Sequence, residues 1–258
     1  MSSRLYSNIP QRRPIQDPTG AANGLKRYTG LRGWLPEAEL GELTIIEDFR
    51  NPFHCTSTGT GAVNATTMAP WRCAHTSAGT GQSTMELVAN TAAGQMSLVT
   101  AANENDGLLI KYMGDVIDPT KPWSFEAEII QADITKSDVS IGCSIDQTAT
   151  TGFAVAGASD DAICFTRIGT GNWLAYTSSD GNDTATDTGV APVNSTAQTL
   201  GIDYNGSDTV KFYVDGALVA TNTTNITDEA MRPMLGFNAG TAAVATGYVN
   251  YMAWHQSA

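Results

Sequence analysis

Hydrophobic and polar residues alternate clearly in the segment Thr199–Ala220. Two short runs, Gly201–Tyr204 and Val210–Val214, place apolar side chains at every other position, which is the period of a half-buried strand. Asp215-Gly216 follows, and this dipeptide is typical of a two-residue hairpin turn because glycine accepts a positive φ without steric cost. The segment therefore predicts a three-stranded meander. Lys211, in mid-strand beside aromatic residues, indicates that one face of the meander is exposed to solvent and that the other faces the core.

A longer alternating run, Trp123–Gln131, predicts the clearest long strand of the chain. The residues expected to face the core are Trp123, Phe125, Ala127 and Ile129, and those expected to face solvent are Ser124, Glu126 and Glu128. Further strands are predicted at Thr44–Phe49, Thr84–Ala89, Met96–Thr100, Leu108–Tyr112, Val139–Asp146, Phe153–Ala156, Ala162–Ile168, Trp173–Tyr176, Met234–Phe237 and Gly247–Trp254. Short strands at this spacing, separated by turn residues, are typical of a sandwich or barrel.

The chain therefore predicts an all-β body with two packed antiparallel sheets. Its expected core includes Phe125, Ile129, Val210, Phe212, Val214, Val249 and Tyr251, or their alternating neighbours. Three stretches break the strand pattern. Arg50–Gly81 is loop-rich with room for edge strands, Ser178–Val193 predicts an exposed polar loop, and Thr227–Met231 predicts one helical turn capped by Thr227 or Asp228.

The N-terminal residues 1–43 are expected to form an extended arm and a short linker turn, followed by one β-sandwich domain over residues 44–258. Proline and glycine recur along the first 34 residues and interrupt every regular element. The stretch still carries more large apolar side chains than a solvated tail usually does. A disordered leader is one interpretation, and we favour an arm that lies on the surface of another protein.

Charge divides the chain into a basic arm and an acidic body. Residues 1–34 contain six basic residues and one acid, which gives +5, whereas the whole chain carries −12 and the remainder therefore −17. This balance argues against a nucleic-acid surface overall. The N-terminal sequence has no apolar signal-peptide core, and no apolar run approaches the ~20 residues that span a bilayer. We expect a soluble protein made in a cytoplasm, with no membrane contact.

Several short motifs carry a resemblance to a known family. The late hairpin Phe212-Tyr213-Val214-Asp215-Gly216 is similar to that of concanavalin A-like, or laminin G-like, jelly rolls. The rest of the series, in order along the chain, is Glu47-Asp48-Phe49, Trp71, Trp123-Ser124-Phe125-Glu126-Ala127-Glu128 and Gly247-Tyr248-Val249-Asn250-Tyr251-Met252. Together they resemble the laminin G-like structural proteins of tailed-phage virions, which are often head decoration or cement proteins.

The resemblance implies a non-enzymatic structural role on the outer surface of a capsid. The expected partner is the major capsid protein of a phage head, and a homo-oligomer, favoured as a trimer at a lattice symmetry axis, is the expected state. No direct contact with nucleic acid is expected. The arm residues expected to bind the capsid are Arg4, Leu5, Tyr6, Ile9, Arg12, Arg13, Arg27, Tyr28 and Trp34.

Catalytic and metal-binding patterns are weak in this sequence. Concanavalin A-like glycosidases share an E-x-D-x-x-E strand motif, and Glu126-Ala127-Glu128 lacks its middle Asp and third acid, so a solvated strand face is the better interpretation. The three histidines have no neighbour at metal or triad spacing, and no enzyme activity or cofactor is expected. Asp160-Asp161 and Asp180–Asp183 offer oxygen ligands for Ca²⁺, although Asp and Asn are also common turn residues. A bridge between Cys55 and Cys73 stays open.

Two alternatives to the decoration role stay open. The first is a carbohydrate-binding module on a virion surface, with Trp173 and Tyr176 as candidates for stacking on a sugar, although a strand tryptophan is more often core. The second is a self-assembling jelly-roll capsid protein whose basic arm faces the packaged genome. Genome-binding arms usually carry dense basic clusters, and here only Arg12-Arg13 and Lys26-Arg27 are adjacent pairs.

Overall fold

The computed structural model describes residues 43–47, 54–56, 64–68, 70–76, 83–88, 94–145 and 161–256. These residues form two stacked antiparallel sheets and contain no helix, which confirms the predicted all-β jelly-roll sandwich. No helix long and apolar enough to cross a membrane occurs in this part of the chain. The arm proposed for residues 1–43 lies outside the described residues, except for the first residue of β1, Leu43.

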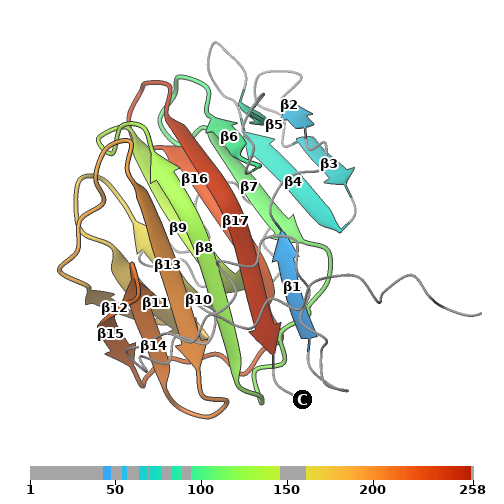
Figure 1. Cartoon of the computed structure of the whole chain (residues 1–258), viewed down its shortest axis with the longest axis vertical. Coiled ribbons are helices and arrows are strands. Elements are labelled where there is room, and N and C mark those ends of the chain that lie inside the picture. Colours follow the sequence, from blue (N-terminus) through green and yellow to red (C-terminus); the bar gives the residue numbers. More distant parts are fainter. Residues whose placement is uncertain are drawn as a thin grey trace, which may run out of the picture.

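The nine-stranded sheet faces the viewer in Figure 1. Its order is β15 (Ala217–Asn222), β14 (Val210–Val214), β13 (Ala197–Tyr204), β8 (Trp123–Gln131), β17 (Thr246–Gln256), β6 (Met96–Val99), β5 (Thr84–Leu87) and β2 (His54–Thr56). β1 (Leu43–Glu47) pairs with the C-terminal half of β17, on the same edge at which β6 pairs with its N-terminal half. β8 and β17, the two longest strands of this sheet, lie side by side at its centre.

The eight-stranded sheet lies behind the first. Its order is β12 (Asn182–Asp187), β11 (Leu174–Ser179), β10 (Ala162–Arg167), β9 (Ser137–Ser144), β16 (Arg232–Ala239), β7 (Gly107–Tyr112), β4 (Trp71–Thr76) and β3 (Asn64–Met68). β2, β3 and β4 occupy the segment expected to be loop-rich. β4 lies between β3 and β7 and is therefore not an edge strand. The predicted strand at Phe153–Ala156 lies outside the described residues.

The meander predicted from the alternating runs is confirmed as β13, β14 and β15. Asp215 and Gly216 both adopt positive φ, 49° and 78°, as a primed two-residue turn requires. The exposed loop predicted at Ser178–Val193 is wrong, because β11 continues to Ser179 and β12 returns beside it. The turn between them, Asp180-Gly181, has φ of 52° and 74° and is therefore a two-residue turn of the same kind as Asp215-Gly216.

The helical turn predicted at Thr227–Met231 is also wrong. This segment is an irregular connection between β15 and β16, with no helical residue. The Thr227 hydroxyl oxygen does accept a hydrogen bond from the Glu229 backbone N–H at 3.0 Å, which is the local contact that a capping threonine makes. The Thr227 side chain therefore stabilises a turn, and no helix follows that turn.

The core lies between the two sheets and is built from alternate residues of each strand. Trp71, Tyr112 and Trp254 meet edge to face, with ring centroids 4.9–5.8 Å apart, and join the two sheets at one side. Phe165 and Phe212 make a similar contact at 5.2 Å farther along. Such edge-to-face pairs add to the free energy gained from burying the rings.

A β-bulge in β17 changes which residues of that strand face the core. The register with β8 shifts between Val249 and Tyr251, so Val249 faces the core, whereas Tyr251 lies on the outer face. Met252 and Trp254 then return to the core. The expected core residues are confirmed except for Tyr251, which is buried on the other side of the sheet.

Candidate functional site

The outer face of the nine-stranded sheet carries three polar or amphipathic side chains in a small area over β13 and β14. Asp203 pairs across the strands with Lys211, and Gly201 pairs with Tyr213. Ile202 and Phe212 occupy the alternate positions and belong to the core. The period of two therefore sends Asp203, Lys211 and Tyr213 to the opposite face.

A pocket of about 340 Å³ opens at this place. The described residues that line it are Asp203, Tyr204, Asn205, Thr209, Lys211 and Tyr213. Lys211 and Asn205 are exposed, whereas Asp203 and Tyr213 are half-buried. The pocket therefore combines a carboxylate, an ammonium group, an amide and the phenol ring of Tyr213, whereas the ring of Tyr204 belongs to the core.

The turn between β13 and β14 forms the rim of the pocket and is held by its own side chains. Asn205 Oδ1 accepts hydrogen bonds from the backbone N–H groups of Ser207, Asp208 and Thr209 at 2.9–3.1 Å. Asn205 Nδ2 donates to Asp208 Oδ1 at 2.9 Å, and hydrogen bonds from Asn205, Thr209 and Ser207 lower the pKa of Asp208. The rim is therefore ordered before any ligand arrives.

Gly206 brings this turn close to a neighbouring loop. It has a positive φ of 83°, and a Cβ added there would lie 2.7 Å from the backbone nitrogen of Pro122. No other residue fits both the backbone conformation and the space. The close approach fixes the rim against the loop that leads into β8.

Asp203 is a carboxyl group of the pocket whose pKa is shifted. Burial raises its pKa above the ordinary value, against the opposing effects of a hydrogen bond with Ser124 and the charge of Lys211. Its Oδ1 atom is buried and has no hydrogen-bond partner among the residues that the structure describes. Burial, and then the nearby Asp203 charge, also raise the pKa of Tyr213. A part-buried carboxylate with one unused oxygen is a typical feature of a binding site.

Glu126 and Glu128 lie on the same outer face, on the neighbouring strand β8. Tyr251 donates its hydroxyl to Glu126 Oε1 at 2.7 Å, and Asn250 donates to Glu128 Oε1. Glu126 is fully buried, so its predicted solvent exposure is wrong. The bulge in β17 explains the difference, because it puts Asn250 and Tyr251 beside the two glutamates.

The aromatic pair predicted for stacking on a sugar is not available in this structure. Trp173 is fully buried, packs edge to face on Phe165 and donates its indole N–H to Gln198 Oε1 at 3.0 Å. Tyr176 is 1% exposed and lies in a small apolar cluster with Cys164. Both rings are therefore structural, and the glycan-stacking assignment at these two positions is corrected.

The oxygen ligands proposed for Ca²⁺ serve as turn and linking residues. Asp161 accepts hydrogen bonds from the Asp180 backbone N–H at 2.9 Å and from the Thr227 hydroxyl at 2.6 Å. It thus joins the start of β10, the β11–β12 turn and the connection before β16. Among the described residues, no three His, Cys, Asp or Glu side chains are grouped to hold a metal ion, and Asp160 lies outside this set.

Cys73 is a buried thiol that forms no disulfide. Its Sγ donates to Met85 Sδ at 3.6 Å across the core, so the bridge to Cys55 is not formed in this structure. Burial raises the pKa of the Cys143 and Cys164 thiols well above the ordinary value, so these thiols are unreactive at neutral pH.

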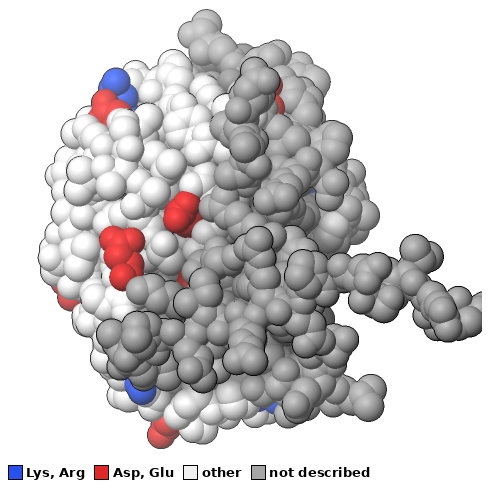
Figure 2. All heavy atoms as spheres, viewed as in Figure 1, with Lys and Arg blue, Asp and Glu red and all other residues white. Residues whose placement is uncertain are grey.

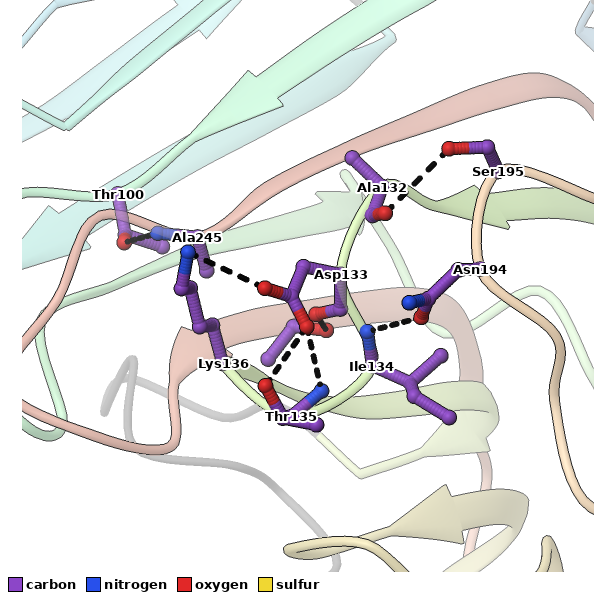
Figure 3. A network of polar contacts seen from close by, with 10 residues as sticks. Thr100, Ala132, Asp133, Ile134, Thr135, Lys136, Asn194, Ser195 and Ala245 are labelled. Carbon is purple, nitrogen blue, oxygen red and sulfur yellow. Dashed lines mark hydrogen bonds and ion pairs between the residues drawn. The ribbon is translucent and has the colours of Figure 1, made fainter.

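One end of the sandwich is closed by polar contacts among loops, shown in Figure 3. Asp133 Oδ1 accepts from the backbone and hydroxyl of Thr135, and Lys136 Nζ lies 3.1 Å from Asp133 Oδ2. The Ile134 backbone N–H donates to Asn194 Oδ1 at 2.8 Å, which ties the β8–β9 loop to the β12–β13 loop. These contacts are internal to the fold.

Figure 2 shows that the described part of the outer surface in front of the nine-stranded sheet is largely uncharged, with isolated acidic and basic side chains. The nine expected capsid-binding residues of the arm lie outside the described residues, so that assignment stays a prediction. Sequence reasoning did not find the pocket, although Lys211 in mid-strand beside aromatic residues was the available signal.

No family model matches the chain, and no curated protein matches it. Among solved structures, a protein of unknown function from Shewanella oneidensis MR-1 is similar over 90% of this chain and 93% of its own, with a TM-score of 0.54 and 11% identity. The Emp47p carbohydrate recognition domain is similar over 74% of this chain and 90% of its own, with a TM-score of 0.49 and 10% identity. A carbohydrate esterase from Shiga toxin-encoding bacteriophage phi24B is similar over 73% of this chain and 90% of its own, with a TM-score of 0.48 and 11% identity. The Shewanella structure shows that the fold, a two-sheet jelly-roll sandwich, is shared over nearly the whole chain.

Proposed function

We propose that this chain is a non-enzymatic structural protein of a tailed-phage virion, which decorates or cements the outer surface of the head. The observation that carries the proposal is the division of charge between the +5 of residues 1–34 and the −17 of the remainder. A basic, aromatic-containing segment ahead of an acidic body suits an attachment arm with an outward-facing domain. The major capsid protein is the proposed partner.

The fold supports the sequence resemblance on which this role also rests. Trp71, Trp123 and Phe125, which belong to the resembling motifs, are all buried core residues of the sandwich. The Asp215-Gly216 hairpin has the backbone conformation that its motif predicts. The motifs are therefore consistent with a common architecture.

The contacts of Glu126 and Glu128 support the non-enzymatic part of the proposal. A retaining glycosidase needs two carboxyl groups that face the substrate from either side of the scissile bond. Here Glu126 is buried and accepts a hydrogen bond from the Tyr251 hydroxyl, and Glu128 accepts a hydrogen bond from the Asn250 side chain. Both carboxylates are thus used within the sheet.

Cosedimentation with phage heads that lack this protein tests the attachment role. The full chain should sediment with the heads, and a chain beginning at residue 35 should stay in the supernatant while its melting temperature is nearly unchanged. Arg12→Glu with Arg13→Glu should weaken attachment, most strongly at low salt where screening is least. Arg72→Glu with Lys121→Glu makes the same change of charge on the body and serves as the control.

Two results would contradict this assignment. Full attachment of the shortened chain would mean that residues 1–34 are not the attachment arm. Closed shells formed by the purified protein alone would favour the self-assembling capsid protein instead, since a decoration protein is expected to give only small soluble oligomers.

A further inference from the structure

We propose that the pocket over β13 and β14 binds a neutral saccharide, through a pair of adjacent hydroxyl groups held between Asp203 and Lys211. This inference concerns a site that the attachment role does not use, and it stands or falls independently of that role. It also replaces the buried pair Trp173 and Tyr176 as the place where a glycan would be bound.

The acceptor side of the site is Asp203. A hydrogen bond with Ser124 lowers the pKa of this carboxyl group, and its Oδ1 atom is buried with no hydrogen-bond partner in the described part of the chain. An unsatisfied buried acceptor destabilises a folded protein, so its presence in a pocket indicates that a ligand supplies the missing donor. A hydroxyl group is a suitable donor, because charge-assisted bonds to carboxylates are short and strong.

The donor side is Lys211, the cross-strand neighbour of Asp203. Directly opposed residues of two antiparallel strands have Cβ atoms about 4.5–5.5 Å apart, so one small ligand reaches both side chains. A sugar hydroxyl both donates and accepts. Two adjacent hydroxyls therefore satisfy a carboxylate and an ammonium group together, one acting as donor and the other as acceptor.

Tyr213 supplies the apolar part of the site. Tyr213 is half-buried on the outer face, whereas the ring of Tyr204 belongs to the core, where it packs against Trp123 with ring centroids 5.9 Å apart. Aromatic rings with one polar end give apolar contact area together with hydrogen bonding, which suits the mixed surface of a pyranose. Thr209 and Asn205 add polar groups at the rim.

Charge and size restrict the ligand class. Asp203 disfavours an anion, and Lys211 disfavours a cation, so a neutral ligand is the best match to the pair. The volume of about 340 Å³ lies near the lower end of the range of about 300–1,000 Å³ for ligand pockets. One or two sugar rings fit this space better than a long chain.

Glycan-array screening followed by ligand-observed NMR, both on the whole 258-residue chain, tests the inference. The NMR probes are glucose, galactose, mannose and N-acetylglucosamine at millimolar concentration, together with any array hit. The wild type should bind at least one neutral sugar, and Asp203→Asn should weaken that binding about tenfold or more. Asp228→Asn makes the same change of charge on the exposed β15–β16 connection and should bind like the wild type.

Lys211→Met is a second variant at an exposed position, where misfolding is not expected, and it should also weaken binding. Thermal melting confirms that each variant is folded. The inference is overturned if no neutral glycan binds, if binding is unchanged in both pocket variants, or if only anionic glycans bind. None of these results bears on cosedimentation with heads.

Discussion

Arg167 is a fully buried cation. Its replacement tests how the sandwich is held together at its loop end, which here means the end that carries the β8–β9 and β10–β11 loops. The guanidinium donates to three backbone carbonyls, those of Gly171 at 3.2 Å, Ser137 at 2.9 Å and Ile134 at 2.6 Å. It also donates to Gln131 Oε1 at 3.2 Å. One side chain on β10 thus joins the β8–β9 loop to the β10–β11 loop.

Arg167→Met removes these donors while keeping much of the volume of the side chain. A buried carbonyl left without its donor costs about 1–3 kcal/mol, and taking the lower figure for three carbonyls gives about 3 kcal/mol. The methionine recovers part of this, because burial lowers the pKa of Arg167 and therefore already opposes its charge. The expected loss is about 2–3 kcal/mol of unfolding free energy, or roughly 4–12 °C in melting temperature for a domain of this size.

Urea and thermal unfolding measure the loss, with Arg232→Met as the matched control. Arg232 forms an ion pair with Asp115 at 2.7 Å, and the Asp115 side chain is 46% exposed. The Arg232 side chain is 11% exposed, but its partner lies at the surface, so the control should lose less stability than Arg167→Met, which removes four buried contacts. If Arg167→Met destabilises no more than Arg232→Met, the carbonyl contacts of Arg167 do not support the loop end and the reasoning is refuted.

Two further predictions follow from the site analysis. Because burial raises the pKa of Asp203, folding disfavours its charged form, and the wild type loses stability as the pH rises from below 3.8 through the raised pKa. Asp203→Asn should therefore match the wild type in acid and become the more stable protein toward pH 7, and thermal melts that differ equally at every pH would contradict this. Calcium should be dispensable for folding, so adding a chelator should leave the melting temperature within about 2 °C, and a larger fall would reveal a structural ion.

Local signals predicted most of the strands. Trp123–Gln131 forms β8 with the expected bounds, because its alternation is long and its turns are polar. The same turn signal was interpreted differently at two places. Asp215-Gly216 stands between apolar runs and was predicted as a hairpin, whereas Asp180-Gly181 stands between polar runs and was assigned to a loop. β12 is an edge strand with no fully buried residue, so its sequence shows no apolar alternation.

The candidate site could not be derived from the sequence for a different reason. Its chemistry depends on which residues face each other across strands. The bulge in β17 moves Tyr251 to the outer face beside Glu126, and a bulge leaves no clear trace in an alternating pattern. The register of β13 and β14 likewise sets Asp203 opposite Lys211. Only the burial of Asp203 Oδ1 then distinguishes this pair from an ordinary surface pair.

Cryo-electron microscopy of decorated heads tests the central claim most directly. Heads incubated with the full chain should show a two-sheet β-sandwich on the outer capsid surface at one class of lattice position, joined to the shell by density for the basic N-terminal residues. Heads incubated with the chain beginning at residue 35 should show no such density. Full occupancy by the shortened chain, or a sandwich absent from the outer surface in both samples, would contradict the account.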